Sequence, residues 1–158
     1  MPHDNLPEPR IEAGRAMRIA GLCERYPYSD CSGIPAQWER FRPWLGAIPG
    51  AVPDAAWGVC CATGNPGLLD YYAGVELEPG NEVPQGLRLM EVPAQHYAKF
   101  AADGHISTLP SAVQAIWGAW VPASGRKAGH GPSLERYGAA FDPVTGEGGY
   151  EIWLPVEP

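Results

Sequence analysis

The chain has 158 residues and a formal net charge of -7, because 18 acidic side chains outnumber 11 lysines and arginines. A chain of this length can bury a substantial core in one domain, so we expect a single domain over residues 1–158. The negative charge argues against a phosphate backbone as partner, since lysines and arginines supply most of the affinity for one. We therefore expect no direct DNA binding and a cationic partner instead.

The sequence has no run of about 18 apolar residues that could span a bilayer. Its first residues, MPHDNLPEPR, have neither the basic start nor the apolar stretch of a signal peptide. We predict a cytoplasmic protein with no membrane attachment.

In chain order the apolar patterns predict six strands and two helices. The strands are expected near residues 15–26, 55–63, 69–78, 87–102, 133–141 and 148–156, and the helices near 34–46 and 109–121. Each helix has a proline in its first turn and then apolar residues at helical spacing. These are Ile34, Trp38, Phe41 and Leu45 in the first helix, and Val113, Ile116, Trp117 and Trp120 in the second.

The chain contains an internal repeat, over about residues 15–79 and 87–158. YYAGVELEP (71–79) aligns without gaps on YEIWLPVEP (150–158), and at the same offset AWGVCCAT falls on ERYGAAFD. Each half reads strand, helix, strand, strand. The pattern predicts an α+β fold of two pseudo-symmetric units with an antiparallel sheet and a ligand cleft on the pseudo-dyad.

The repeat also predicts one acidic and aromatic patch. By strand alternation Glu135 and Tyr137 share one face, Glu151 and Trp153 share a face of the next strand, and a hairpin through DPVTGEGG is expected to bring the two sets together. The repeat sets Ala56 and Gly58 against Glu135 and Tyr137, and Tyr72 and Gly74 against Glu151 and Trp153, so that one half supplies side chains and the other supplies space.

The predicted patch suits a delocalised cation, because aromatic faces and a partly desolvated carboxylate both attract positive charge. One of Trp117 and Trp120 is expected in the core, with the other reaching the cleft. Tyr72 and Tyr137 are the further candidate wall residues.

The cysteines and histidines indicate no metal site. Cys60 and Cys61 would point to opposite faces of a strand, and no CxxC pair is present, so all four cysteines are interpreted as reduced thiols. The four histidines form no HExxH motif. We expect no metal and no cofactor.

Four segments together resemble a known family. DYYAGVELEPG, VPAQHYAKFAADG, WGAWVPASG and LERYGAAFDPVTGEGGYEIWLPV are similar to the GyrI-like small-molecule-binding domain, which is also the effector-binding part of AraC- and MerR-type multidrug regulators. The resemblance covers about residues 15–156. It implies a cleft that holds bulky, aromatic, often cationic compounds, with an acidic residue at its floor; that residue falls on Glu135, with Glu151 as a second candidate.

Three functions follow from these observations. The first is a standalone protein that binds or sequesters an aromatic, cationic compound, because the helix-turn-helix segment of such regulators is not found. The second is a hydrolase of strained, cyclopropane-type DNA-alkylating compounds, as the resemblance implies for some members, with Glu135 and Tyr137 directing a water or a proton. The third is a partner of another protein, either gyrase or a DNA-binding regulator chain.

Overall fold

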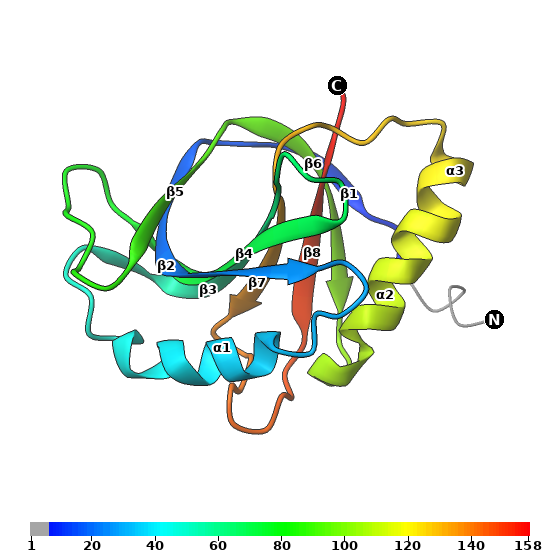
Figure 1. Cartoon of the computed structure of the whole chain (residues 1–158). Coiled ribbons are helices and arrows are strands. Elements are labelled where there is room, and N and C mark those ends of the chain that lie inside the picture. Colours follow the sequence, from blue (N-terminus) through cyan, green and yellow to red (C-terminus); the bar gives the residue numbers. More distant parts are fainter. Residues whose placement is uncertain (1–6) are drawn as a thin grey trace.

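The computed structural model describes residues 7–158, which form an α+β fold with one curled antiparallel sheet of eight strands (Figure 1). The strands are β1 (Arg10–Gly14), β2 (Met17–Pro27), β3 (Ala51–Ala62), β4 (Leu68–Leu77), β5 (Arg88–Val92), β6 (Gln95–Ala102), β7 (Ser133–Gly138) and β8 (Tyr150–Val156). The predicted fold class is confirmed.

Two helical segments pack on one face of the sheet. The first is α1 (Ile34–Phe41) followed by the 3-10 turn η2 (Arg42–Trp44), and the second runs through η3 (Ile106–Thr108), α2 (Leu109–Ala115), the π-helical turn η4 (Ile116–Trp120) and α3 (Val121–Ser124). Pro122 has no N–H for an intrahelical hydrogen bond, which accounts for irregular backbone at this point. Within residues 7–158, no helix is long and apolar enough to cross a membrane.

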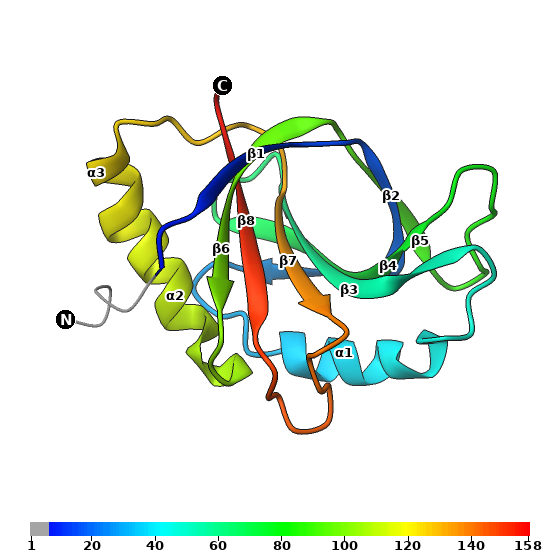
Figure 2. The same cartoon turned by 180° about the vertical axis from the view of Figure 1, so that it is seen from behind.

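The strand order is β1-β6-β8-β7-β3-β4-β2-β5, which is symmetric about the central β7–β3 pair (Figure 2). The two outermost strands are exchanged between the halves, because β1 pairs with β6 and β5 pairs with β2. The single strand predicted over residues 87–102 is therefore wrong. β5 ends at Val92 and β6 begins at Gln95, and the two strands lie in opposite halves of the strand order. The prediction also missed β1.

The two hairpins differ in length. Val59 pairs with Tyr72, whereas Arg136 pairs with Glu151, so the β7–β8 connection is two residues longer than the β3–β4 connection. The alignment without gaps matches β4 to β8 correctly, but it therefore matches each residue of β3 to a residue of β7 that is two positions too far along the chain. Strand alternation survives such an error, because a shift of two residues keeps every side chain on its own face.

With this shift applied, Gly58 is the counterpart of Glu135, and the two are also direct register partners between β3 and β7. The pseudo-twofold axis therefore passes through the Gly58–Glu135 pair. The sequence alignment had set Ala56 against Glu135, which is the wrong residue of the same strand face.

The curl of the sheet creates two unlike faces. The sulfurs of Cys61 on β3 and Met90 on β5 lie 3.8 Å apart although two strands separate them, a distance that a flat sheet does not allow. The inner face of the curl holds a core that includes Trp57, Tyr72 and Tyr97. The opposite face, called here the helix face, is covered by the two helical segments.

A buried glutamine fastens α1 to the helix face. Gln37 has no exposed surface, and its Nε2 donates to the carbonyl oxygens of Leu22 and Tyr71, 2.8 and 2.9 Å away. Its Oε1 accepts a hydrogen bond from Tyr26 Oη at 2.7 Å. The apolar spacing alone placed Trp38 and Phe41 toward the sheet and gave no sign of a polar residue there.

We expect Gln37→Leu to lower the free energy of unfolding by about 2 to 4 kcal/mol, because it leaves the partly buried Tyr26 hydroxyl and two carbonyls short of a partner. Chemical denaturation measures the difference. Gln114→Leu is the matched control, since Gln114 is exposed on α2. Equal effects at the two positions would contradict the anchoring role of Gln37.

Candidate functional site

The centre of the site is a carboxylate held by two tyrosines. Glu135 on β7 accepts hydrogen bonds at Oε1 from Tyr71 Oη at 2.6 Å and from Tyr137 Oη at 2.7 Å. Trp38 Nε1 in turn donates to Tyr71 Oη at 3.0 Å, so α1, β4 and β7 contribute to one network. The predicted pairing of Glu135 with Tyr137 on one face is present in this arrangement.

The space for this carboxylate comes from Gly58, which lies opposite Glu135 where β3 pairs with β7. A Cβ on Gly58 would overlap both Tyr71 Oη and Glu135 Oε1. Gly58 and Glu135 pair directly at the pseudo-dyad. A large polar side chain therefore lies next to a residue that has no side chain. The repeat predicted this division between the halves, with Ala56 in place of Gly58 as the counterpart of Glu135.

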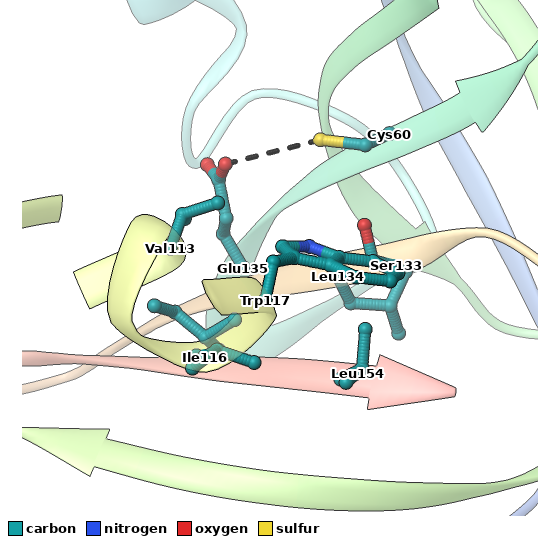
Figure 3. A pocket seen from close by; sticks show the side chains of 9 residues that line it. Cys60, Val113, Ile116, Trp117, Ser133, Leu134, Glu135 and Leu154 are labelled. Carbon is teal, nitrogen blue, oxygen red and sulfur yellow. Dashed lines mark hydrogen bonds between the residues drawn. The ribbon is translucent and has the colours of Figure 1, made fainter. Parts of the chain in front are cut away.

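Glu135 lines a small pocket of about 70 Å³ between the sheet and the second helical segment (Figure 3). Its other lining residues come from β3, β7, β8, α2 and η4: Cys60, Val113, Ile116, Trp117, Ser133, Leu134, Ile152 and Leu154. Apart from Glu135, Ser133 and the Cys60 thiol, the walls are apolar.

Burial dominates the electrostatics of the site. It raises the pKa of the Glu135 carboxyl above its usual range, while the hydrogen bonds from Tyr71 and Tyr137 act in the opposite direction. Burial, and next the charge of Glu135, raise the pKa of both phenols well above their usual value. Among residues 7–158, no lysine, arginine or histidine forms an ion pair with Glu135, so the site holds an acid without a counter-cation.

The second predicted acid lies elsewhere. Glu151 accepts a hydrogen bond from Trp153 Nε1 at 2.7 Å and forms an ion pair with Arg10 at 3.7 Å. The Trp153 ring packs against Trp57 on the inner face of the curl. The prediction that Glu135 and Glu151 line one patch is wrong.

The physical reason is register. Glu135 pairs with Ile152 across the β7–β8 ladder, so it shares a face with Ile152. The neighbouring Glu151 therefore projects to the other side of the sheet. The prediction from strand alternation was correct within each strand, whereas the sequence did not determine the register between the strands.

Two more candidates lie on the inner face. Tyr72 is only 7% exposed in the inner core, on the same face as Glu151, as the repeat predicts. Gly74 pairs with Gly21, and a Cβ on either would overlap the backbone of the neighbouring strand, so this pair permits close approach of β2 and β4. The structure gives neither residue a contact with the Glu135 pocket.

The two tryptophans of the second helical segment divide as expected. Trp120 packs edge-on against Phe100 in the core, with ring centroids 5.1 Å apart. Trp117 is 50% exposed and lines the pocket. Of the four apolar residues predicted on one helix face, Val113, Ile116 and Trp120 pack in the core of the helix face, whereas Trp117 is half exposed and lines the pocket beside Ile116.

Sequence reasoning missed Tyr71, Trp38 and Cys60 as site residues. The repeat favoured Tyr72 over Tyr71 as a site residue, because Tyr72 aligns with Glu151 whereas Tyr71 aligns with Tyr150. Alternation along β4 carried a signal for the correct choice, since Tyr71 shares a face with Ala73 and so with α1. No group of three or more histidine, cysteine or acidic side chains in the described part of the chain is placed to hold a metal ion.

Similar folds are found in proteins of known structure. SAV2435 bound to tetraphenylphosphonium matches with a TM-score of 0.76 and 16% identity, over 96% of this chain and 94% of that one. An integron cassette protein from the mobile metagenome of Vibrio cholerae matches with a TM-score of 0.72 and 19% identity, over 96% and 97% of the two chains. The C-terminal domain of EcmrR matches with a TM-score of 0.65 and 15% identity, over 97% and 98%.

At the level of sequence, the chain is 31% identical over 149 residues to the transcriptional regulator BrlR of Pseudomonas aeruginosa. The match covers 93% of this chain and 54% of BrlR, so the chain spans about half the length of that regulator. The family model of the GyrI-like small molecule binding domain matches residues 7–157. This chain therefore belongs to the GyrI-like small-molecule-binding domain family.

Proposed function

We propose that the chain binds a bulky, aromatic, cationic compound in the pocket at Glu135. The observation that carries the proposal is a half-buried carboxylate that accepts hydrogen bonds from two neutral hydroxyls and has no cationic partner within residues 7–158. An acid in this environment is unfavourable for folding and gains most from a cation that brings its own apolar surface.

The ligand class is supported by one structural neighbour. SAV2435, which shares the fold, has been solved with tetraphenylphosphonium, a permanent cation surrounded by four aromatic rings. In this chain, the apolar pocket walls would contact such rings, while Glu135 attracts the charge.

The pocket must widen to admit a ligand of this size. A volume of about 70 Å³ is roughly half that of a cavity known to hold benzene. The wall formed by Val113, Ile116 and Trp117 is the one that the proposal requires to move, because Trp117 is already half exposed while the other walls are strands of the sheet.

Hydrolysis of an electrophile is the second candidate. A carboxyl with a raised pKa beside Tyr137 is suited to proton transfer, which favours this reaction over other enzymatic ones. Mass analysis of each bound compound distinguishes the two functions, since a binding protein returns its ligand unchanged.

We expect Glu135→Gln to weaken binding of tetraphenylphosphonium about tenfold. A charge pair near 4 Å at an effective dielectric constant of 20 has an energy of about 4 kcal/mol, of which desolvation should leave about 1 to 2. Calorimetry measures the affinity, with neutral triphenylphosphine oxide as the uncharged comparison ligand.

The matched control for this prediction is Glu151→Gln, which removes an equal charge from the opposite face of the sheet. It should leave the affinity for tetraphenylphosphonium within about twofold. Equal losses for the charged and neutral ligands in Glu135→Gln would mean that the carboxylate shapes the pocket without attracting the cation.

We expect Glu135→Gln to become more stable relative to the unsubstituted protein as pH rises. The folded-state pKa of Glu135 is raised, so its contribution to stability is fully present below the unfolded-state pKa and is lost as pH rises through the folded-state value. Free energies of unfolding measured between pH 4 and pH 8 test this difference.

Tyr137→Phe provides the complementary variant. It removes a hydrogen bond that lowers the pKa of Glu135, so the loss of stability with rising pH should be larger than in the unsubstituted protein. A stability difference between Glu135→Gln and the unsubstituted protein that stays constant with pH would show that the carboxylate titrates alike in both states.

A further inference from the structure

A thiol lies in the same pocket and has no part in the function proposed above. Cys60 on β3 lines the pocket, and its Sγ lies 4.0 Å from Glu135 Oε2 (Figure 3). Both tyrosine hydroxyls bond to Oε1, so Oε2 is the oxygen that faces Cys60 and accepts no N–H or O–H donor from the described residues. The pocket thus places a nucleophile, a proton acceptor and apolar walls together.

We propose that Cys60 captures flat, aromatic carbon electrophiles of the Michael-acceptor class that enter this pocket, with Glu135 as the base. The inference rests on the proposed function in using the same pocket for an aromatic ligand, and it adds a covalent outcome for electrophilic ones. It requires no cationic group on the electrophile.

The proposed reaction is balanced without another reactant. Cys60 Sγ forms a bond to the β-carbon of the acceptor, and the electrons of the carbon–carbon double bond move toward the carbonyl group to give an enolate. The thiol proton passes to Glu135 Oε2 as the sulfur–carbon bond forms, and Glu135 then returns it to the enolate. The product is a thioether at Cys60 and an unchanged carboxylate.

The environment of Cys60 makes this capture dependent on the pocket. Burial, and next the charge of Glu135, raise the pKa of the Cys60 thiol well above its usual value, so it is a thiol and not a thiolate at neutral pH. Little Cys60 thiolate is therefore present to react with a reagent that does not bind in the pocket. An electrophile held in the pocket lies beside both the sulfur and the base, and proximity compensates for the protonated state.

The other thiols lack this combination. Cys23 and Cys61 pack against the inner core on the opposite face of the sheet, and burial raises the pKa of Cys61 to about 12. Cys31 precedes α1 and is half-buried, and its thiol contacts the carbonyl oxygen of Pro27 at 3.6 Å. Cys60 is the one of the four whose sulfur lies within hydrogen-bonding reach of a carboxylate among the described residues.

The test uses N-phenylmaleimide, a flat aromatic Michael acceptor that adds one thiol and needs no oxidant. The full chain is treated with one equivalent, and peptide mapping by mass spectrometry locates the adduct over time. We expect the adduct to form first at Cys60, to be absent there in Cys60→Ser and to persist in Cys31→Ser. First labelling at Cys31 would overturn the proposal.

Glu135→Gln distinguishes two roles for Glu135, as the base that accepts the thiol proton or only as a charge near Cys60. If Glu135 accepts the proton, the variant should label Cys60 at least tenfold more slowly. If Glu135 only raises the pKa of the thiol by its charge, the variant should label Cys60 faster, and that result contradicts the proposal. Iodoacetamide, which has no aromatic ring, should show no preference for Cys60 in either protein.

Tetraphenylphosphonium connects this test with the proposed function and keeps their failures apart. Saturating tetraphenylphosphonium should slow labelling of Cys60 and leave Cys31 unaffected. If calorimetry shows that the cation binds while N-phenylmaleimide never labels Cys60, the capture reaction alone is wrong. If the cation does not bind while Cys60 is labelled first, the proposed function is wrong and the reactive pocket stands.

Discussion

The site depends on how the carboxylate of Glu135 is kept in an apolar environment. Two phenolic hydroxyls donate to one of its oxygens, and a tryptophan N–H extends the network into α1. Hydrogen bonds of this kind offset part of the cost of removing a charge from water. Unlike a lysine or arginine in the same place, they do not neutralise the carboxylate when it is ionised.

This arrangement explains why the seam between β3 and β7 has unequal sides. A twofold repeat with Glu on both strands would bring two carboxylates together at the axis, where they would repel each other. Gly58 at the equivalent position avoids that repulsion and supplies the space that the side chains of Glu135 and Tyr71 occupy. The pseudo-symmetry of the backbone is kept, while the chemistry of the site is asymmetric.

The sequence was sufficient for the fold class and for the face on which each side chain of a strand lies, because both follow from patterns along the chain. Strand alternation placed Glu135 with Tyr137, and one of Trp117 and Trp120 was expected in the core without the sequence indicating which; it is Trp120. The sequence was insufficient where the register between two strands decides which of their side chains share a face. Glu151 lies beyond the site because it pairs with Arg136, and no local property of either residue encodes that pairing.

The exchange of β1 and β5 sets a condition on how the chain can fold. β1 completes the edge beside β6 in the second half, and β5 completes the edge beside β2 in the first. A fragment ending at the linker after Leu77 would keep β1 without its partner and would leave β2 with an open edge, a surface prone to pairing with other chains. Pairing of Arg10 with Lys99 can be made only after most of the chain has left the ribosome, so complete closure of the sheet is a late event in synthesis.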